Sequence, residues 1–239
     1  MTTETATRPA ADADTARHTG RAVPTRRISL EESLAEVPKH FAKDGDLIQS
    51  HLMAVLSSLF PDGEDFFVRS VRHYRDQITE PELKRQVAGF IGQESVHGRE
   101  HRVFNDRLDE LGYPTKRIEA IVRRLFEFRE DKVPASSNLA VTAALEHFTA
   151  VLAELLLTDP DLRELTGHPA VTELFAWHAL EESEHKAVAV DVYRAVGGTE
   201  RMRRWTMKGV RKGFVSFTTL MLVASLLGRP RDLPARCPA

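Results

Sequence analysis

Apolar residues recur every three or four positions along almost the whole chain from Ile28 onward, which is the spacing of one face of an α-helix. Alternation of the kind that predicts a β-strand is scarce, and glycines and prolines fall mostly between the periodic stretches. The pattern therefore predicts an all-α fold.

The periodic stretches divide into successive helices. The first helical region covers about 29–58 and is interrupted near Gly45, and the Pro61-Asp62-Gly63 run predicts a turn. Further helices are expected at about 62–78, 81–112, 115–132, 138–158, 169–197 and 199–227. Four of them, at 62–78, 81–112, 138–158 and 169–197, are the candidates for a four-helix core that the others flank.

The two ends of the chain are predicted to lie outside the helical domain. Residues 1–28 are rich in Thr, Ala, Arg and Asp and have few large apolar side chains, so this segment is predicted to be a disordered tail. Residues 29–228 then form one helical domain, and 229–239 form a second tail.

Charge and cysteine content bear on the partners and the cellular location of the protein. Lys and Arg total 33 and Asp and Glu total 35, so the net charge of −2 argues against a nucleic-acid partner. Cys237 is the single cysteine, and the N-terminal segment lacks the apolar core of a secretory signal. A cytoplasmic protein is expected.

Several carboxylates and histidines interrupt apolar helix faces. Glu146 lies in an almost purely apolar stretch, where an ionised carboxylate is costly unless it is paired or binds a metal. Glu94 and His97 stand at positions i and i+3 of helix 81–112, and Glu182 and His185 repeat that spacing in helix 169–197. Two such pairs and lone glutamates on two other helices are the arrangement of di-metal carboxylate bundles. The alternative for Glu146 is an edge position facing water or an arginine.

Glu64 is the candidate glutamate of the fourth helix. It lies 16 residues before the expected turn near residue 80, and Glu94 lies 14 after it. Glu146 lies 12 residues before position 158, and Glu182 lies 13 after position 169. Each pair matches within two residues, or about 3 Å along a helix axis, so all four carboxylates are expected in one layer. The alternative for Glu64 is a carboxylate that stabilises the positive end of a helix dipole.

Three further histidines lie near these positions. His178 precedes Glu182 by four residues and shares its helix face, so it is a candidate third nitrogen ligand or a hydrogen-bonded core histidine. His101 lies one turn beyond His97 and is a candidate for orienting the ligands from behind. His147 points about 100° away from its neighbour Glu146 and is the weakest candidate.

Three segments carry a resemblance to known ferritin-like proteins. The runs Phe60-Pro-Asp-Gly-Glu64, Gln93-Glu94-Ser-Val-His97-Gly and His178-Ala-Leu-Glu-Glu182-Ser-Glu-His185 resemble a bacterial family described as predicted metal-dependent hydrolases. The last run is also similar to the p-aminobenzoate N-oxygenase family of di-iron enzymes, which uses four glutamates and three histidines. The resemblance implies a ferritin-like four-helix bundle with flanking helices and assigns the metal-ligand roles to Glu64, Glu94, His97, Glu146, His178, Glu182 and His185.

The donor set favours redox-active metals. Carboxylate and imidazole ligands suit two iron ions, or a manganese and iron pair, and the lack of thiolates argues against structural zinc. The hypothesis is a di-iron oxygenase that uses O2 to oxidise a small organic substrate at an amine or C–H group, with electrons from a reductase or another reductant. The alternatives are a binuclear metal-dependent hydrolase, in which two metals activate water, and a non-catalytic metal-binding protein.

The last helix has an unusual composition. Residues 213–228 carry no charge, and six Lys and Arg residues lie between 201 and 212. This run is shorter than the ~20 residues needed to span a bilayer. The segment 201–228 is expected to pack on the bundle or on the second subunit of a homodimer, or to lie on a membrane surface.

Overall fold

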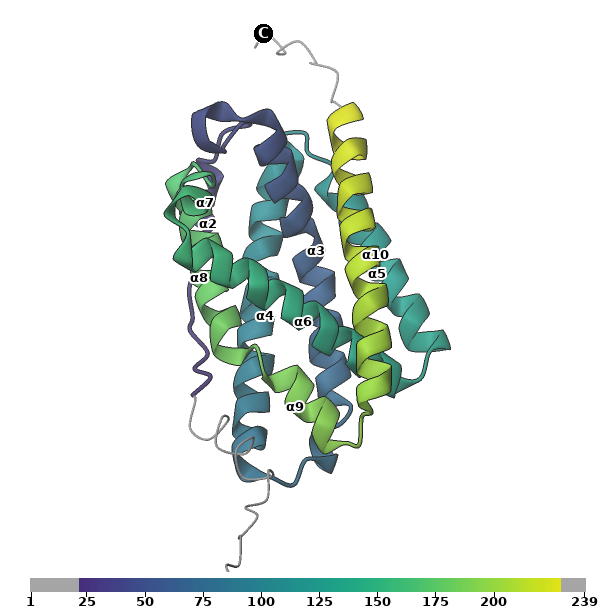
Figure 1. Ribbon diagram of the computed structural model, residues 1–239. Coiled ribbons are helices and arrows are strands. Elements are labelled where there is room, and N and C mark those ends of the chain that lie inside the picture. The colour runs from purple at the N-terminus through teal and green to yellow at the C-terminus, as the bar shows by residue number, and fades with distance from the viewer. Residues whose placement is uncertain (1–21, 229–239) are drawn as a thin grey trace, which may run out of the picture.

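The computed structural model describes residues 22–228, in which every regular element is helical, so the prediction of an all-α fold is confirmed (Figure 1). In chain order the elements are α2 (Glu31–Ala35), the 3₁₀ turn η1 (Lys43–Gly45), α3 (Leu47–Arg72), the 3₁₀ turn η2 (Arg75–Gln77), α4 (Pro81–Glu110), α5 (Thr115–Lys132), α6 (Ala135–Thr158), α7 (Pro160–Glu164), α8 (Pro169–His185), α9 (Val188–Ala195) and α10 (Glu200–Leu227).

The bundle is built from two helix pairs. Helix α3 packs along α4, and α6 packs against α8 and α9, while α5 flanks α3 and α10 packs against both α6 and α3 (Figure 1). Two apolar clusters hold the ends of the bundle together, one containing Phe90 and Val188 and the other Phe104 and Leu174. On α4 and on α8 the residues between these clusters are largely polar. The bundle therefore contains a buried polar layer between two hydrophobic layers.

Helix α3 differs from the prediction, because it runs through Pro61 where a turn was expected. Proline has no N–H, so the carbonyl of Ser57 one turn earlier loses its helical partner. Asn105 on α4 replaces it, donating its side-chain N–H to the Ser57 carbonyl oxygen at 3.1 Å. This tertiary contact compensates for the missing bond, so the start expected at 62 was wrong. The end expected at 78 was also wrong, because α3 ends at Arg72 and η2 follows as a separate turn. The predicted break at Gly45 is confirmed, with φ +72°.

The helix expected at 169–197 is also different, because two turn residues divide it into α8 and α9 directly after His185. The buried face of α9, with Val188 and Val192, continues the helical spacing of α8. Apolar periodicity alone therefore does not reveal the break. The region expected to be helical at 29–58 contains only the short α2 and the turn η1 before α3 begins, and α7 was not predicted. Helices α4, α5, α6 and α10 lie close to their expected positions.

Residues 22–30, here called the N-terminal strap, lie across α4 and α8. Of the tail predicted at residues 1–28, only residues 22–28 belong to the described chain, and residues 1–21 and the tail predicted at 229–239 lie outside it. Two glycines of α4 let the strap approach closely, because an added Cβ at Gly89 would lie 2.1 Å from the Val23 carbonyl oxygen and at Gly92 2.1 Å from Thr25 Oγ1. This close approach explains glycines that are otherwise unfavourable inside a helix.

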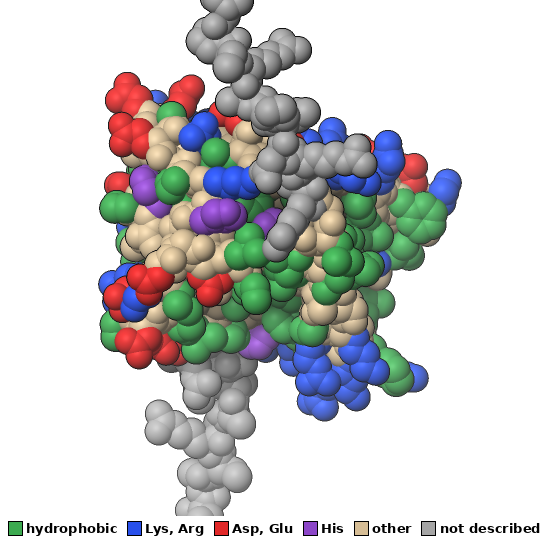
Figure 2. Space-filling model, turned by 90° about the horizontal axis from the view of Figure 1, so that it is seen from above, with side chains coloured by type: hydrophobic (Ala, Val, Ile, Leu, Met, Phe, Trp, Pro, Cys, Tyr) green, Lys and Arg blue, Asp and Glu red, His purple; other side chains and the backbone are tan. Residues whose placement is uncertain are grey.

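Two helices, α6 and α10, are long and apolar enough to cross a membrane by length and composition, which is weak evidence for a span. Helix α6 is half-buried in the bundle, whereas α10 leaves Leu220 60% and Leu227 82% exposed. Viewed from the end where α10 finishes, hydrophobic side chains lie uncovered beside clusters of Lys and Arg (Figure 2).

Candidate metal centre

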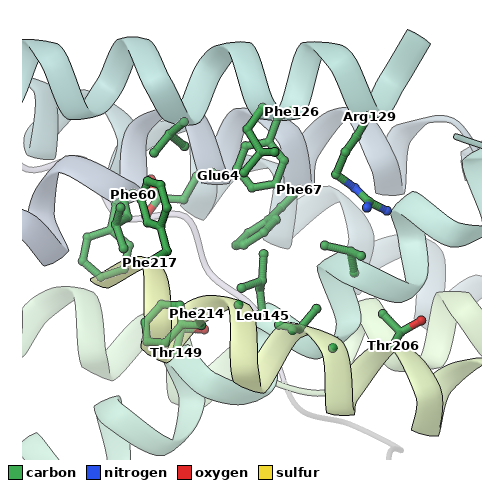
Figure 3. A pocket seen from close by; sticks show the side chains of 18 of the residues that line it. Phe60, Glu64, Phe67, Phe126, Arg129, Leu145, Thr149, Thr206, Phe214 and Phe217 are labelled. Atoms are coloured by element: carbon green, nitrogen blue, oxygen red, sulfur yellow. The ribbon is translucent and has the colours of Figure 1, made fainter. Parts of the chain in front are cut away.

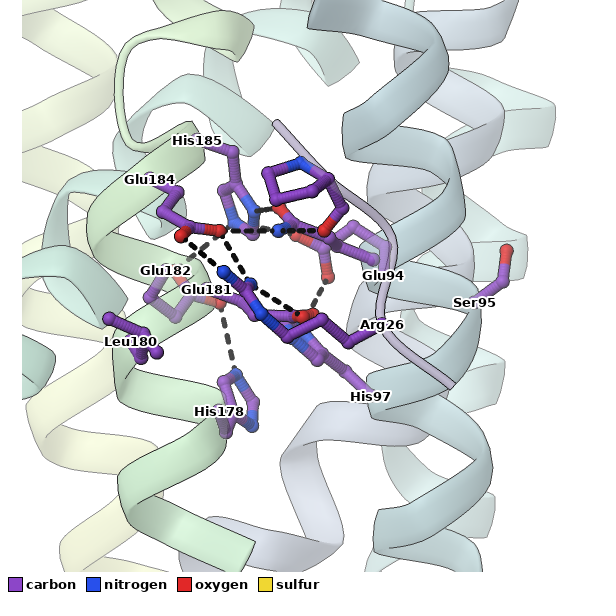
Figure 4. Close-up of polar contacts among 12 residues, drawn as sticks. Arg26, Glu94, Ser95, His97, His178, Leu180, Glu181, Glu182, Glu184 and His185 are labelled. Atoms are coloured by element: carbon purple, nitrogen blue, oxygen red, sulfur yellow. Dashed lines mark hydrogen bonds and ion pairs between the residues drawn. The ribbon is translucent and has the colours of Figure 1, made fainter. Parts of the chain in front are cut away.

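The polar layer brings together the seven candidate ligands that the sequence indicates. They are Glu64 from α3, Glu94 and His97 from α4, Glu146 from α6, and His178, Glu182 and His185 from α8. None is more than 4% exposed. Figure 4 shows several of these side chains converging between α4 and α8. The expectation that the four carboxylates meet in one layer agrees with this arrangement.

The ligands form two groups. In the first, donor atoms of Glu64, His97 and His178 all lie within 4.8 Å of one another, and in the second the same holds for Glu94, Glu182 and His185. Glu182 connects the groups, because its two oxygens lie 3.0 Å from His178 Nε2 and 3.5 Å from His185 Nε2.

Glu146 belongs beside the second group. Its Oε2 lies 3.4 Å from His185 Nε2, so the predicted alternative of an edge position facing water is wrong. The geometry is compatible with two adjacent cation sites.

Buried carboxylate oxygens without hydrogen bonds make this layer suitable for metal ions. Both oxygens of Glu64, Glu94 and Glu146 and one oxygen of Glu182 are buried and make no hydrogen bond among the described residues. Such groups are costly to bury unless a counter-charge compensates them. Four ionised carboxylates carry four negative charges, which two divalent cations would balance.

The carboxylates and histidines perturb one another strongly. Burial, together with the charges of Glu94 and Glu182, raises the pKa of Glu64 and of Glu146 well above the usual range. Burial opposes ionisation of Glu182 as well, but His185 and His178 hold its pKa well below that range. These opposite shifts are those of crowded like charges that share a few cationic partners.

The orientation of His97 is fixed from behind by Glu181. His97 Nε2 lies 3.1 Å from Glu181 Oε2, so its N–H donates to this carboxylate and leaves Nδ1 for a metal. Arg26 of the N-terminal strap donates to Glu181 at 3.0 Å and to Glu184 at 2.7 and 2.8 Å (Figure 4). Burial raises the pKa of Glu181, but the hydrogen bonds from His97 and Arg26 outweigh it and lower the pKa overall. The strap thus participates in the surroundings of the site.

His185 is held in the same manner by Gln93. His185 Nδ1 lies 2.8 Å from Gln93 Oε1, so Nδ1–H donates to the amide oxygen and Nε2 faces Glu94 at 3.0 Å. The Gln93 amide in turn donates to Glu184 at 2.9 Å and to the Pro24 carbonyl at 3.0 Å. These contacts determine which way the Gln93 amide points.

A hydrogen-bonded chain leads from His178 away from the site. His178 Nδ1 lies 2.7 Å from His101 Nε2, and His101 Nδ1 lies 2.8 Å from Ser57 Oγ. Ser57 then donates to Asn105 Oδ1 at 2.6 Å, and Asn105 donates to Glu119 at 2.8 Å. If every N–H and O–H points toward Glu119, the His178 Nε2 lone pair faces Glu64 and Glu182. The position predicted for His101, behind a ligand, is the observed one.

His147 does not belong to the layer, and three residues beside the layer were not predicted. His147 is exposed and points away from the layer. Sequence reasoning missed Glu181, Gln93 and Arg26, whose roles depend on contacts between α4, α8 and the strap. The only signal for the first two was their place directly beside Glu182 and Glu94 in the sequence.

An apolar cavity adjoins the layer on the side of α3. Its volume is about 550 Å³, and Glu64 and Phe60 form part of its wall (Figure 3). The ring of Phe60 lies 4.6 Å from the rings of both His101 and His178. The cavity therefore reaches the candidate ligands at Glu64.

Comparison with known proteins agrees with a metal centre. A family model described as "Predicted metal-dependent hydrolase" matches residues 24–236, which is most of the chain. No curated protein and no solved structure matches the chain significantly. The match covers the whole bundle and all seven candidate ligands. The chain belongs to the family of predicted metal-dependent hydrolases.

Proposed function

We propose that the chain is a di-iron enzyme that uses O2 to oxidise an apolar organic substrate. The observation that carries this proposal is the juxtaposition of a seven-residue carboxylate and imidazole cluster with an apolar cavity that meets it at Glu64. Carboxylate and imidazole donors suit iron and manganese. An apolar cavity suits a substrate without polar groups near the reacting bond.

The candidate ligands form two groups, each of which would bind one ion. Glu64, His97 and His178 would hold one ion, and Glu94, Glu182 and His185 the other, with Glu146 beside the second. When bound, two ferrous ions supply two electrons to O2.

The proposed oxidation needs electrons and protons from outside the substrate. Inserting one oxygen atom into a C–H bond and reducing the other atom to water consumes one O2, two protons and two electrons per turnover. A reductase or thiol donor would supply those electrons. A bundle interior that excludes bulk water protects such a reaction from side products.

A binuclear hydrolase is the second candidate, and the family description favours it. Two metal ions lower the pKa of a bound water and make a nucleophile at neutral pH. This reaction needs a polar substrate and a route for water. The apolar lining of the cavity beside Glu64 supports oxidation over hydrolysis.

The test loads full-length protein with ferrous iron without oxygen and then mixes it with O2 in a stopped-flow spectrometer. The proposal expects a visible absorption change and consumption of one O2 per two ferrous ions. Glu94→Gln should lose this response, because it removes a ligand charge. Glu100→Gln should keep it, because Glu100 is equally buried but contacts Leu30 and Arg99 instead of the site.

Two results would decide against oxidation. Iron-loaded protein that binds two ions but does not consume O2 contradicts the oxygenase proposal. Turnover of ester or amide substrates by the zinc- or manganese-loaded protein, lost in Glu94→Gln, would establish the hydrolase instead.

A further inference from the structure

The cavity beside Glu64 is elongated and almost entirely apolar. It lies between α3, α5, α6 and α10, and on α10 its wall extends from Thr206 to Phe217 (Figure 3). At 1.5 Å per residue that distance is about 16 Å along the helix. Leu125 and Leu152 line its rim and are 49% and 39% exposed, so a ligand can reach it from solvent. A volume of about 550 Å³ is that of a small-molecule site.

Three glycines keep this space open. Gly63 of α3 and Gly209 and Gly213 of α10 line the cavity, and a Cβ added at any of them would meet no atom within 4 Å. A glycine inside a helix is less favourable than alanine. No close backbone approach requires these three, unlike Gly89 and Gly92. Their common property is the volume that they leave beside the cavity.

One end of the cavity is polar. Arg129, Ser137 and Thr206 line it there, and Figure 3 shows Arg129 and Thr206 at the end opposite Phe60 and Phe217. Arg129 Nε is buried and makes no hydrogen bond among the described residues. Within residues 22–228, the hydrogen bond that the Arg129 guanidinium does make is a long one of 3.5 Å to Ser137 Oγ. A guanidinium in such surroundings attracts an anionic group, which it can bind through two N–H bonds.

The candidate metal centre lies between the two ends. Helix α5 runs parallel to α3, since Arg123 pairs with Asp62 and Glu130 pairs with Arg69. Arg129 is therefore level with residue 68 of α3, about 6 Å along the axis from Glu64. A chain that starts at Arg129 and follows α10 passes Glu64 before it reaches Phe217.

We propose that the cavity binds a single-chain anionic amphiphile of the medium-chain fatty acid class. Its carboxylate pairs with Arg129, and its hydrocarbon chain lies along the glycine face of α10 with a middle carbon beside Glu64. As a statement about the substrate, this rests on the proposed function. As a statement about binding, it stands on the cavity alone.

The test measures binding of decanoate and of 1-decanol to the full-length protein by isothermal titration calorimetry. Decanoate is expected to bind at one saturable site per chain. Arg129→Gln should weaken decanoate roughly tenfold or more and leave 1-decanol unchanged, because only the acid uses the charge. Arg124→Gln, which removes an exposed charge from the same helix, is the control.

A second pair of variants tests the position of the chain. Gly213→Leu should weaken both ligands roughly tenfold or more, because the leucine fills volume that the chain occupies. Ser216→Leu adds the same side chain at an exposed position of α10 outside the cavity and should change neither affinity. Circular dichroism melting curves check that all variants fold.

Several outcomes would overturn the proposal. They are no saturable binding of decanoate, binding that Gly213→Leu leaves unchanged, or an Arg129→Gln variant that weakens acid and alcohol equally. Binding without O2 consumption by the iron-loaded protein would leave this cavity assignment intact and refute the proposed oxidation. O2 consumption without decanoate binding would do the reverse.

Discussion

Replacing Glu181 with glutamine tests how the N-terminal strap and α8 prepare His97 for metal binding. Glu181 has a fully buried side chain, and its polar partners among the described residues are His97 Nε2 at 3.1 Å and Arg26 at 3.0 Å. Glutamine has nearly the same shape and retains one acceptor oxygen. The substitution therefore removes a charge from the partner of His97 with little change in packing.

The contact with His97 should determine the size of the effect. Arg26 is 35% exposed, so its pair with Glu181 is screened by solvent and contributes at most about 1 kcal/mol. Loss of an outer partner of a ligating histidine typically lowers metal affinity about 10- to 100-fold. That range corresponds to about 1.4–2.7 kcal/mol. We expect Glu181→Gln to fall within it.

A competition titration of ferrous or zinc ions against a coloured chelator measures this affinity in the full-length protein. Glu100→Gln is the matched control, because Glu100 is buried on α4 and holds the strap at the Leu30 amide without touching a candidate ligand. Unchanged metal affinity in Glu181→Gln would refute the argument. An equal loss in Glu100→Gln would also refute it, by showing that the strap acts through general stability.

Three further predictions concern Glu146, the N-terminal strap and α10. Burial and neighbouring carboxylates raise the pKa of Glu146 above its usual value of 4.5. The contribution of Glu146 to the stability of the fold is therefore fully present below pH 4.5 and is lost as the pH rises through the folded-state pKa. Metal-free Glu146→Gln should therefore have a higher melting temperature than wild type at pH 7, by about 2–4 °C for each kcal/mol gained in the free energy of unfolding. A lower melting temperature would contradict this. Gly92→Leu should displace the strap, because its Cβ would lie 2.1 Å from Thr25 Oγ1, and trypsin should cleave there faster than in the exposed control Ser95→Leu. Leu220→Asp, at a position that is 60% exposed on α10, should reduce binding to anionic lipid vesicles if this helix contacts membranes, and equal sedimentation with vesicles would argue against that role.

Most of the candidate ligands could be predicted from the sequence because they violate a local rule. Glu146 stands in an apolar helix, and Glu94 with His97 and Glu182 with His185 interrupt buried faces at helical spacing. Such violations are visible without any partner. Placing the four glutamates in one layer then needed only the rise per residue of a helix and the approximate positions of the turns.

The features that the sequence did not reveal depend on tertiary contacts. Helix α3 passes through Pro61 because Asn105 bonds the carbonyl that proline leaves free, and the two residues are far apart in sequence. The strap contacts α8 through Arg26 and lies against two glycines of α4, and no local sequence pattern reveals these contacts. The cavity, likewise, is defined by four helices together and has no local sequence pattern.

The central claim is that the seven side chains bind two metal ions, and metal analysis tests it most directly. Full-length protein would be loaded anaerobically with ferrous iron, freed of loosely bound ions by gel filtration, and analysed by plasma mass spectrometry beside Glu94→Gln and Glu100→Gln. The account predicts two irons per chain in wild type and in Glu100→Gln, and fewer than two in Glu94→Gln. One iron or none in the wild type, or two in all three proteins, would contradict it.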